Sequence, residues 1–250
     1  MRHRMLETRK PGRGSRTSHA HVVDELGRQI VSGAMAVGSL LPGDAELAQR
    51  FKVSRTVLRE TMKTLAAKGL IVPRARVGTR VTGKNLWNMF DSDVINWHFE
   101  GGVNEEFLLH LYDVRLAFEP FAAGLVAERA TEEDIARLRH LAKRMGDAGH
   151  TVDSLALADL EFHLAIAEFS RNPFMRTVGS LIEAALVGMF RLSSPSSQDE
   201  LGIGDVSLTH MRIVDAIAAR DPEAAKKAME HVIIVGRDHI RENFARVAIG

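Results

Sequence analysis

The sequence contains no cysteine among its 250 residues. Disulfide bonds, thiolate metal ligands and cysteine nucleophiles are therefore excluded, and nothing in the composition indicates an oxidising compartment. Long apolar runs are also missing, because no stretch approaches the roughly 18 consecutive apolar residues of a membrane helix. The basic start of the chain is not followed by the apolar segment of a secretory leader. We therefore expect a cytoplasmic protein that makes no membrane contact.

Charge is divided unevenly along the chain, although the formal net charge is only +1. Residues 1 to 83 hold 16 Lys and Arg against 6 Asp and Glu, which leaves 17 against 26 in the remainder. A basic module of this size suits a polyanion, whereas an acidic helical module does not. A basic tail alone does not explain the excess, because residues 17 to 83 are still basic. The two parts are therefore expected to have different partners.

The basic part has the pattern of a winged helix-turn-helix. Residues 1 to 19 are predicted to form a flexible basic arm, followed by helices near residues 20 to 33, 44 to 51 and 55 to 68. Ser54 is expected to cap the third helix and Gly69 to end it. Two β-prone runs at residues 70 to 73 and 78 to 81 then predict a small hairpin. We assign the DNA-binding domain to residues 20 to 83.

The rest of the chain is predicted to be helical. Residues 84 to 103, which alternate polar and apolar side chains, are expected to form an ordered linker. Helical spacing and capping residues then predict helices near 104 to 129, 131 to 147, 151 to 170, 173 to 192, 204 to 219 and 222 to 247. The fold class is thus mainly α, with an all-α antiparallel helical bundle over residues 104 to 248.

Cationic side chains on the third helix suggest contact with nucleic acid. Arg55 and Arg59 are four residues apart and share a face opposite the apolar one, with Thr56 near the helix start. Guanidinium groups placed in this way can reach guanine edges or phosphates. The alternative is an ordinary solvated helix face with local ion pairs. The basic hairpin and arm of the same small domain favour the DNA-binding interpretation.

Asp159 and His163 have a spacing that suits a metal ion. Residues four apart on a helix project from one face, so both side chains can bind one cation. His210 and His231 lie on later predicted helices, and a bundle can bring such side chains together. The alternative for any one histidine is a hydrogen-bonded residue of the core or surface. The spacing alone does not show that the four side chains converge.

The basic domain resembles the DNA-binding domain of the GntR family of bacterial regulators. The resemblance lies in Leu41-Pro42-Gly43-Asp44, in Val53-Ser54-Arg55-Thr56-Val57-Leu58-Arg59-Glu60, in Gly69-Leu70-Ile71 and in Gly78-Thr79. It implies that Arg55, Thr56 and Arg59 contact the operator from the recognition helix and that Gly78 enters the minor groove. Two positions depart from the family pattern, because Ala45 and Val77 stand where relatives often have basic or polar residues. Arg76 is the expected compensating contact.

The helical part resembles the FCD effector domain of the FadR subfamily. The resemblance lies in Val114-Arg115, Glu119-Pro120, Asp159-Leu160-Glu161-Phe162-His163, Arg171-Asn172-Pro173-Phe174, Thr209-His210 and His231. It implies a divalent metal held by Asp159, His163, His210 and His231, a set that suits Zn²⁺ first and also Ni²⁺ or Mn²⁺. It also implies that Arg115 faces the carboxylate of a small effector. The alternative for Arg115 is a surface ion pair with Glu119, four residues away. The linker is similar to that of regulators of sugar-acid catabolism, which indicates a sugar acid.

These features predict a homodimeric repressor that binds double-stranded operator DNA and is not an enzyme. One alternative is a metal-dependent hydrolase with an accessory DNA-binding domain, since Asp159 and the histidines can activate a water. However, the sequence has no His-Glu-x-x-His, no Gly-x-Ser-x-Gly and no phosphate loop. Another alternative is a structural DNA-binding protein whose bundle only dimerises. Release from DNA on addition of a ligand is expected of a regulator and not of such a structural protein.

Overall fold

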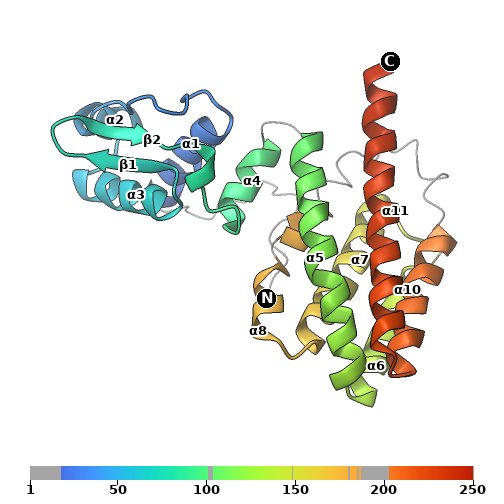
Figure 1. The fold of residues 1–250 in the computed structure, drawn as a ribbon. Helices are drawn as coiled ribbons and strands as arrows, with labels where there is room; N and C mark the ends of the chain where they lie inside the picture. Colours follow the sequence, from blue (N-terminus) through green and yellow to red (C-terminus); the bar gives the residue numbers. More distant parts are fainter. Residues whose placement is uncertain are drawn as a thin grey trace. The chain divides into compact units, whose positions relative to one another are not determined.

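The computed structural model describes residues 18–100, 104–147, 149–179, 181–184, 186 and 203–249. Contacts divide the chain into two compact units, which we call the N-terminal unit, within Thr8–Gly102, and the C-terminal unit, within Val103–Gly250. The predicted basic arm lies outside the described residues except for its last two positions, which begin the first helix. The fold is mainly α, as the sequence predicts (Figure 1).

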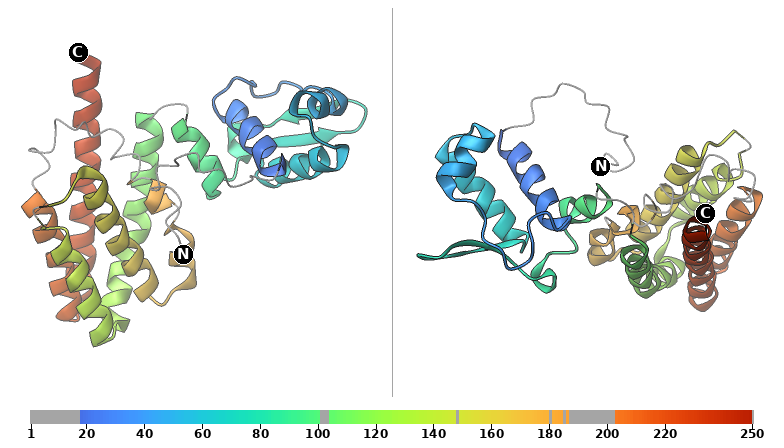
Figure 2. Two further views of the ribbon diagram at one scale, coloured as in Figure 1. Left: turned by 180° about the vertical axis from the view of Figure 1, so that it is seen from behind. Right: turned by 90° about the horizontal axis from the view of Figure 1, so that it is seen from above.

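The N-terminal unit is a winged helix-turn-helix. Its elements are α1 (Ser18–Val31), α2 (Asp44–Phe51), α3 (Arg55–Ala67), β1 (Ile71–Arg74) and β2 (Gly78–Val81). The two strands pair antiparallel, with Ile71 opposite Val81 and Arg74 opposite Gly78. The hairpin extends beyond the three helices (Figure 2). One apolar core, which includes Leu26 and Leu65, joins the helices to the base of the hairpin.

Helix α3 begins and ends where the sequence predicts. The side chain of Ser54 accepts a hydrogen bond from the backbone N–H of Val57 at 3.3 Å, as an N-cap should. Leu58, Thr61 and Leu65 recur at helical spacing and are buried. The helix ends at Lys68, and Gly69 follows with a φ of +78°. This φ lies in the left-handed region, where glycine is favoured.

The predicted linker contains a helix that the sequence analysis did not anticipate. A short 3₁₀ turn, η1 (Lys84–Leu86), is followed by α4 (Ser92–Glu100). Helix α4 buries Val94, Ile95, Trp97 and Phe99. The alternation of polar and apolar residues in this segment predicts an ordered linker and gives no sign of a helix. Helix α4 packs on α1, and Val94 and Trp97 join the apolar core of the N-terminal unit.

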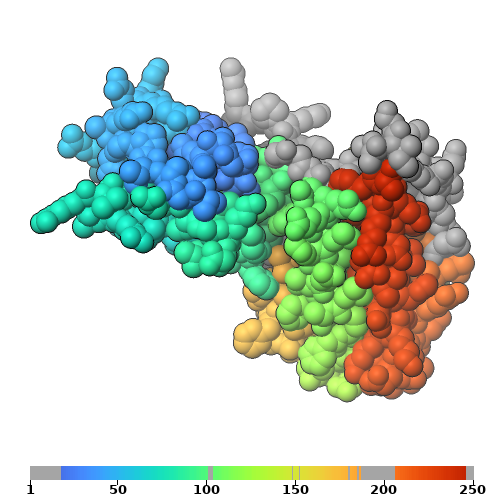
Figure 3. All heavy atoms as spheres, turned by 45° about the horizontal axis from the view of Figure 1, so that its top comes forward, coloured from blue at the N-terminus to red at the C-terminus, as the bar shows by residue number. Residues whose placement is uncertain are grey.

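The C-terminal unit is a bundle of helices. They are α5 (Glu105–Arg129), α6 (Glu132–Arg144), α7 (Val152–Phe169), α8 (Pro173–Thr177), α10 (Ile203–Ala218) and α11 (Pro222–Ile249). The long helices α5 and α11 lie side by side (Figures 1 and 3). Helix α10 packs on α11 and α6, and α7 packs on α5 and α6. The predicted helix at 173 to 192 extends past the described residues, so only part of it is tested.

Capping side chains start several of these helices. Thr131 with Asp134 and Thr151 with Ser154 each form a reciprocal capping box.

None of the helices in the described part of the chain combines the length and the apolar character that a bilayer span requires.

Gly69 gives the first testable prediction. A Cβ added there would lie 1.9 Å from the carbonyl oxygen of Leu86, in addition to the strain of the positive φ. Gly33 has a similar φ of +82° but nothing within 4 Å of such a Cβ. We expect Gly69→Ala to lower the free energy of unfolding by about 3 kcal/mol or more, and Gly33→Ala by about 1 kcal/mol.

Urea unfolding followed by tryptophan fluorescence measures this difference. The chain has two tryptophans, Trp87 and Trp97, and both lie in the N-terminal unit. Equal losses for the two glycine variants would show that the backbone contact at Leu86 has no role.

Candidate functional site

The outward face of α3 is basic. Arg55, Thr56 and Arg59 are all exposed, and 69% of the Arg59 side chain is accessible. Lys63, one turn further along, is also exposed and was not named from the sequence. Oε1 of Glu60 lies 3.1 Å from Nζ of Lys63 and 3.7 Å from Nε of Arg59, so both cations share one exposed carboxylate. This face can present guanidinium groups to phosphates or base edges.

The hairpin adds a second exposed basic feature. It protrudes from the N-terminal unit (Figure 3), and Arg74 and Arg76 near its tip are exposed. Arg76 and Gly78 both have positive φ values, +62° and +106°, so the chain reverses tightly between the strands. Arg80 is different, because its Nη1 donates to the carbonyl oxygen of Gly38 in the same unit. The charge at the tip therefore comes from Arg74 and Arg76.

Asp159, His163 and His210 form a compact buried group in the C-terminal unit. The carboxylate Oδ1 of Asp159 lies 2.9 Å from Nε2 of His210 and 3.6 Å from Nε2 of His163. The two Nε2 atoms are 3.4 Å apart. One ligand atom from each residue lies within 4.8 Å of the others, and all three residues are buried. This group can hold a metal ion.

The hydrogen bonds of the two histidines fit a metal site. His163 donates from Nδ1 to the carboxylate of Glu119, and His210 donates from Nδ1 to the carbonyl oxygen of Val206 at 2.7 Å. A neutral imidazole has one N–H, so the Nε2 atom of each histidine keeps a lone pair. These two nitrogens and the carboxylate of Asp159 can serve as ligands of one cation. Histidine ligands of metals are oriented by such Nδ1 hydrogen bonds.

Arg115 and Glu119 extend the buried group. Nε of Arg115 donates to Glu119 at 2.5 Å, and Nη2 lies 3.4 Å from Nε2 of His163. Burial opposes the charged forms of Arg115, Glu119, Asp159 and His163, but the opposite charges of their neighbours outweigh its effect on each pKa. Burial alone would lower the pKa of His163, yet Glu119 and Asp159 raise it to about 9. Burial would raise the pKa of Glu119, yet Arg115 and His163 lower it to about 2.

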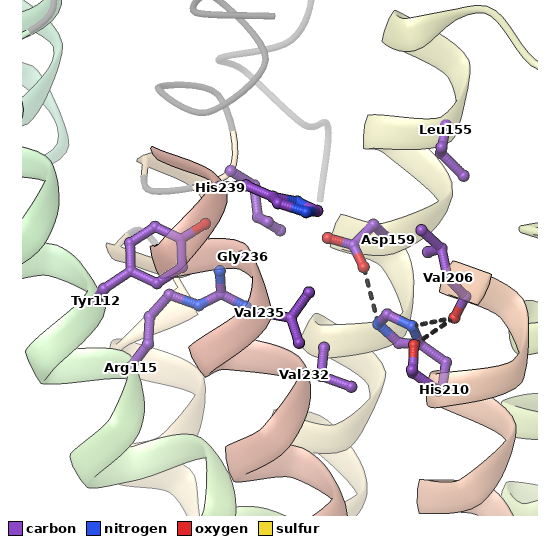
Figure 4. Close-up of a pocket in the computed structure, with 12 residues that line it drawn as sticks. Tyr112, Arg115, Leu155, Asp159, Val206, His210, Val232, Val235, Gly236 and His239 are labelled. Atoms are coloured by element: carbon purple, nitrogen blue, oxygen red, sulfur yellow. Dashed lines mark hydrogen bonds and ion pairs between the residues drawn. The ribbon is translucent and has the colours of Figure 1, made fainter. Parts of the chain in front are cut away.

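A pocket adjoins this group (Figure 4). Asp159 and His210 line one side of it, and Tyr112 and Arg115 of α5 line another. Helix α11 contributes an apolar wall together with His239; the lining residues of this helix are Val232, Val235, Gly236 and His239. Burial raises the pKa of Tyr112 to about 12, so its hydroxyl keeps its proton near neutral pH. The pocket thus combines an apolar wall with a cation and hydrogen-bonding groups.

His231 does not join the other three expected metal ligands. Its side chain is exposed, whereas the next residue of α11, Val232, lines the pocket. Successive residues of a helix point about 100° apart, so a shift of one position turns a side chain out of the pocket. The four-residue set implied by the resemblance therefore reduces in this structure to Asp159, His163 and His210.

Sequence reasoning did not assign a role to Tyr112 or Glu119. The ion pair between Arg115 and Glu119 was considered, but as a surface pair. In the structure only 3% of Arg115 and 2% of Glu119 are accessible. The apolar Ala122 and Ala123 follow Glu119 closely and are also buried, which is a signal that this part of α5 lies inside the bundle.

The fold, a winged helix-turn-helix with a helical bundle, is that of a DNA-binding transcriptional regulator, and comparisons with known proteins agree. Residues 19–81 match the bacterial regulatory proteins of the gntR family, and residues 110–234 match the FCD domain. The chain belongs to the GntR family of transcriptional regulators and carries an FCD domain.

Related proteins cover nearly the whole chain. The helix-turn-helix transcriptional regulator YieP of Escherichia coli is 32% identical over 214 residues, which are 85% of this chain and 90% of YieP. The galactonate operon transcriptional repressor of the same organism is 30% identical over 221 residues, 88% of this chain and 96% of the repressor. These relatives are transcriptional regulators, in agreement with the expectation that the chain is not an enzyme.

Solved structures show the same fold. Lar of Listeria monocytogenes has a TM-score of 0.60 at 18% identity, and the likeness covers 92% of this chain and 99% of Lar. McbR/YncC of E. coli has a TM-score of 0.51 at 16% identity, covering 92% of this chain and 100% of that protein.

The buried histidine and the exposed histidine give the second prediction. We expect His163→Ala to lose most of the bound metal, because it removes one of three ligand atoms that already converge. His231→Ala should keep the metal content of the wild type, because its side chain is exposed. Elemental analysis of both purified variants, loaded with Zn²⁺ and desalted, measures the difference. Equal metal loss in the two variants would restore His231 to the ligand set.

Proposed function

We propose that the chain is a repressor whose affinity for operator DNA is controlled by a small carboxylate metabolite bound beside a metal ion. The observation that carries this proposal is that Arg115, Asp159 and His210 line one pocket, and that the buried His163 completes the three-residue group behind it. A cation that already has protein ligands and a guanidinium on the same cavity suit an anionic ligand.

The N-terminal unit would supply the contacts to DNA. Arg55, Thr56 and Arg59 would reach the major groove from α3, and Arg76 and Gly78 would approach the minor groove from the hairpin. All five residues are exposed. We assign DNA binding to residues 20 to 83, with the linker at 84 to 103. A homodimer would place two such units on a palindromic operator in the bacterial cytoplasm.

Asp159, His163 and His210 would hold the metal ion. Two imidazoles and one carboxylate suit Zn²⁺ first, with Ni²⁺ and Mn²⁺ as alternatives. Three protein ligands leave at least one position open in a tetrahedral site. When bound, the metal supplies a localised positive charge and an open position for an oxygen ligand.

The balance of charge favours an effector with one carboxylate. Histidine ligands are neutral, so the two carboxylates of Asp159 and Glu119 face Arg115 and a divalent metal. One positive charge is then in excess, and a single carboxylate neutralises it. Tyr112, Thr209 and His239 add polar groups that a polyhydroxylated chain can use. Together with the galactonate operon repressor among the relatives, this favours a sugar acid for the effector domain at residues 104 to 248.

Operator binding provides the third prediction. A duplex enriched from a randomised DNA pool by the wild-type chain serves as the operator. We expect Arg59→Ala to weaken binding to it by about 10-fold to 100-fold, since one arginine contact to a base contributes about 1–3 kcal/mol. Arg144→Ala, which removes the same charge from the C-terminal unit, should change affinity less than about twofold. Fluorescence anisotropy measures both, and similar losses would argue against α3 as the reading helix.

Effector release provides the fourth prediction. We expect galactonate, at millimolar concentration, to release the Zn²⁺-loaded protein from the enriched duplex and to raise its melting temperature. Galactitol, which keeps the hydroxyl groups but lacks the carboxylate, should do neither. A panel of other sugar acids in the same assay identifies a better effector. If no carboxylate in the panel shifts melting or DNA binding, the effector class is wrong, while the operator measurement remains a separate test of DNA binding.

A further inference from the structure

Two lysines, one within α3 and one at its C-cap, differ in their exposure to solvent. Lys63 is exposed, and 64% of its side chain is accessible. Lys68, the C-cap residue, is buried, with 11% of its side chain accessible. Its ammonium lies 2.7 Å from both carboxylate oxygens of Asp91 and 3.0 Å from Asp93. The ammonium of Lys68 is therefore paired inside the N-terminal unit, whereas Lys63 lies on the surface, where it pairs with the exposed Glu60.

Asp91 joins this lysine to the start of α4. The same Oδ1 atom that meets Lys68 accepts hydrogen bonds from the backbone N–H groups of Asp93 at 3.0 Å and Val94 at 3.3 Å. Asp91 therefore satisfies N–H groups at the N-terminus of α4, as an N-cap does. The C-terminus of α3 and the N-terminus of α4 are thus joined through one carboxylate.

The backbone of Lys68 makes a second connection to the same segment. Its carbonyl oxygen accepts a hydrogen bond from the N–H of Asn88 at 2.9 Å. Burial would lower the pKa of the Lys68 ammonium, but the hydrogen bonds to Asp91 and Asp93 raise it. Lys68 therefore remains charged over the physiological range, and its ion pairs persist there.

The remainder of α4 is anchored on α1. The indole ring of Trp97 lies where a Cβ on Gly27 would stand, 2.3–2.5 Å from three ring carbons, so no larger residue fits. Nε1 of Trp97 donates to Asp24 at 3.0 Å. Arg28 of α1 pairs with Glu100, the last residue of α4, at 2.6 Å. Helix α4 is thus attached at its start, middle and end to the unit that contains α3.

We propose that Lys68, Asp91 and Asp93 form a clasp that fixes the recognition helix to α4 and that these are positioning residues for operator recognition. The inference rests on the proposed DNA-binding function. Lys68 touches no DNA in this scheme; it sets where Arg55 and Arg59 point.

Hydrogen exchange tests the clasp itself on the full-length protein. In Lys68→Met we expect the amides of Val94 to Phe99 to exchange at least about fivefold faster, while the amides of α2 keep their wild-type rates. Asp91→Asn combined with Asp93→Asn should have the same effect, because asparagine still caps the helix but leaves Lys68 without a charged partner. Lys68→Arg should exchange like the wild type. Unchanged α4 rates in the first two variants would overturn the inference.

DNA binding tests the positioning role. Against the duplex enriched by the wild-type chain, we expect Lys68→Met to bind about 10-fold more weakly, with less than about a twofold change for a scrambled duplex of equal length. Lys68→Arg should recover most of the loss. Lys63→Met is the matched control, because an exposed lysine near phosphates should weaken both duplexes alike and reduce the salt dependence by about one counterion.

The outcomes separate the inference from the proposed function. If Lys68→Met weakens both duplexes equally, or Lys68→Arg does not restore selectivity, Lys68 contributes charge or stability alone and the inference is overturned. If the wild-type chain itself enriches no duplex, the DNA-binding proposal fails, and the positioning role fails with it.

Discussion

Five ionisable side chains buried within one helical bundle must compensate one another, and the C-terminal unit is organised by this requirement. An isolated buried charge costs several kcal/mol, so each group is tolerated only because the others are placed correctly. Glu119 connects the two ends of the network, since it accepts hydrogen bonds from both Arg115 and His163. Asp159 then faces His163 and His210. Binding of a cation or an anion in the adjoining pocket changes this balance directly.

The sequence predicted the arrangement of helices well because their signals are local. Ser54 caps α3 where expected, and apolar spacing identified the inner face of that helix. Helices α6 and α7 begin close to the predicted positions 131 and 151. The i,i+4 pair of Asp159 and His163 was also readable, since a single helix fixes it. Helix α4 was missed because its nine residues pack on α1, and no local pattern records this contact.

The finer features of the metal site were less accessible to sequence analysis. Which histidine of α11 reaches the pocket depends on the rotation of that helix, and one residue changes the direction of a side chain by about 100°. His231 was assigned on resemblance, whereas His239 is the histidine of α11 that lines the pocket, and Val232 lines it beside the exposed His231. Glu119 was underestimated for a related reason. Its pairing with Arg115 is visible in the sequence, but burial depends on the packing of α5 within the bundle.

The same type of charge serves different purposes in the N-terminal unit according to its exposure. Exposed arginines on α3 are surrounded by water and salt ions, which a polyanion can displace. Their charges therefore contribute to binding of a polyanion rather than to the stability of the fold. The buried Lys68 has no such freedom, because Asp91 and Asp93 already surround it. A count of basic residues therefore overestimates the charge available to DNA. Arg80 and Lys68 act within the fold, and the reading surface consists of the cations that remain exposed.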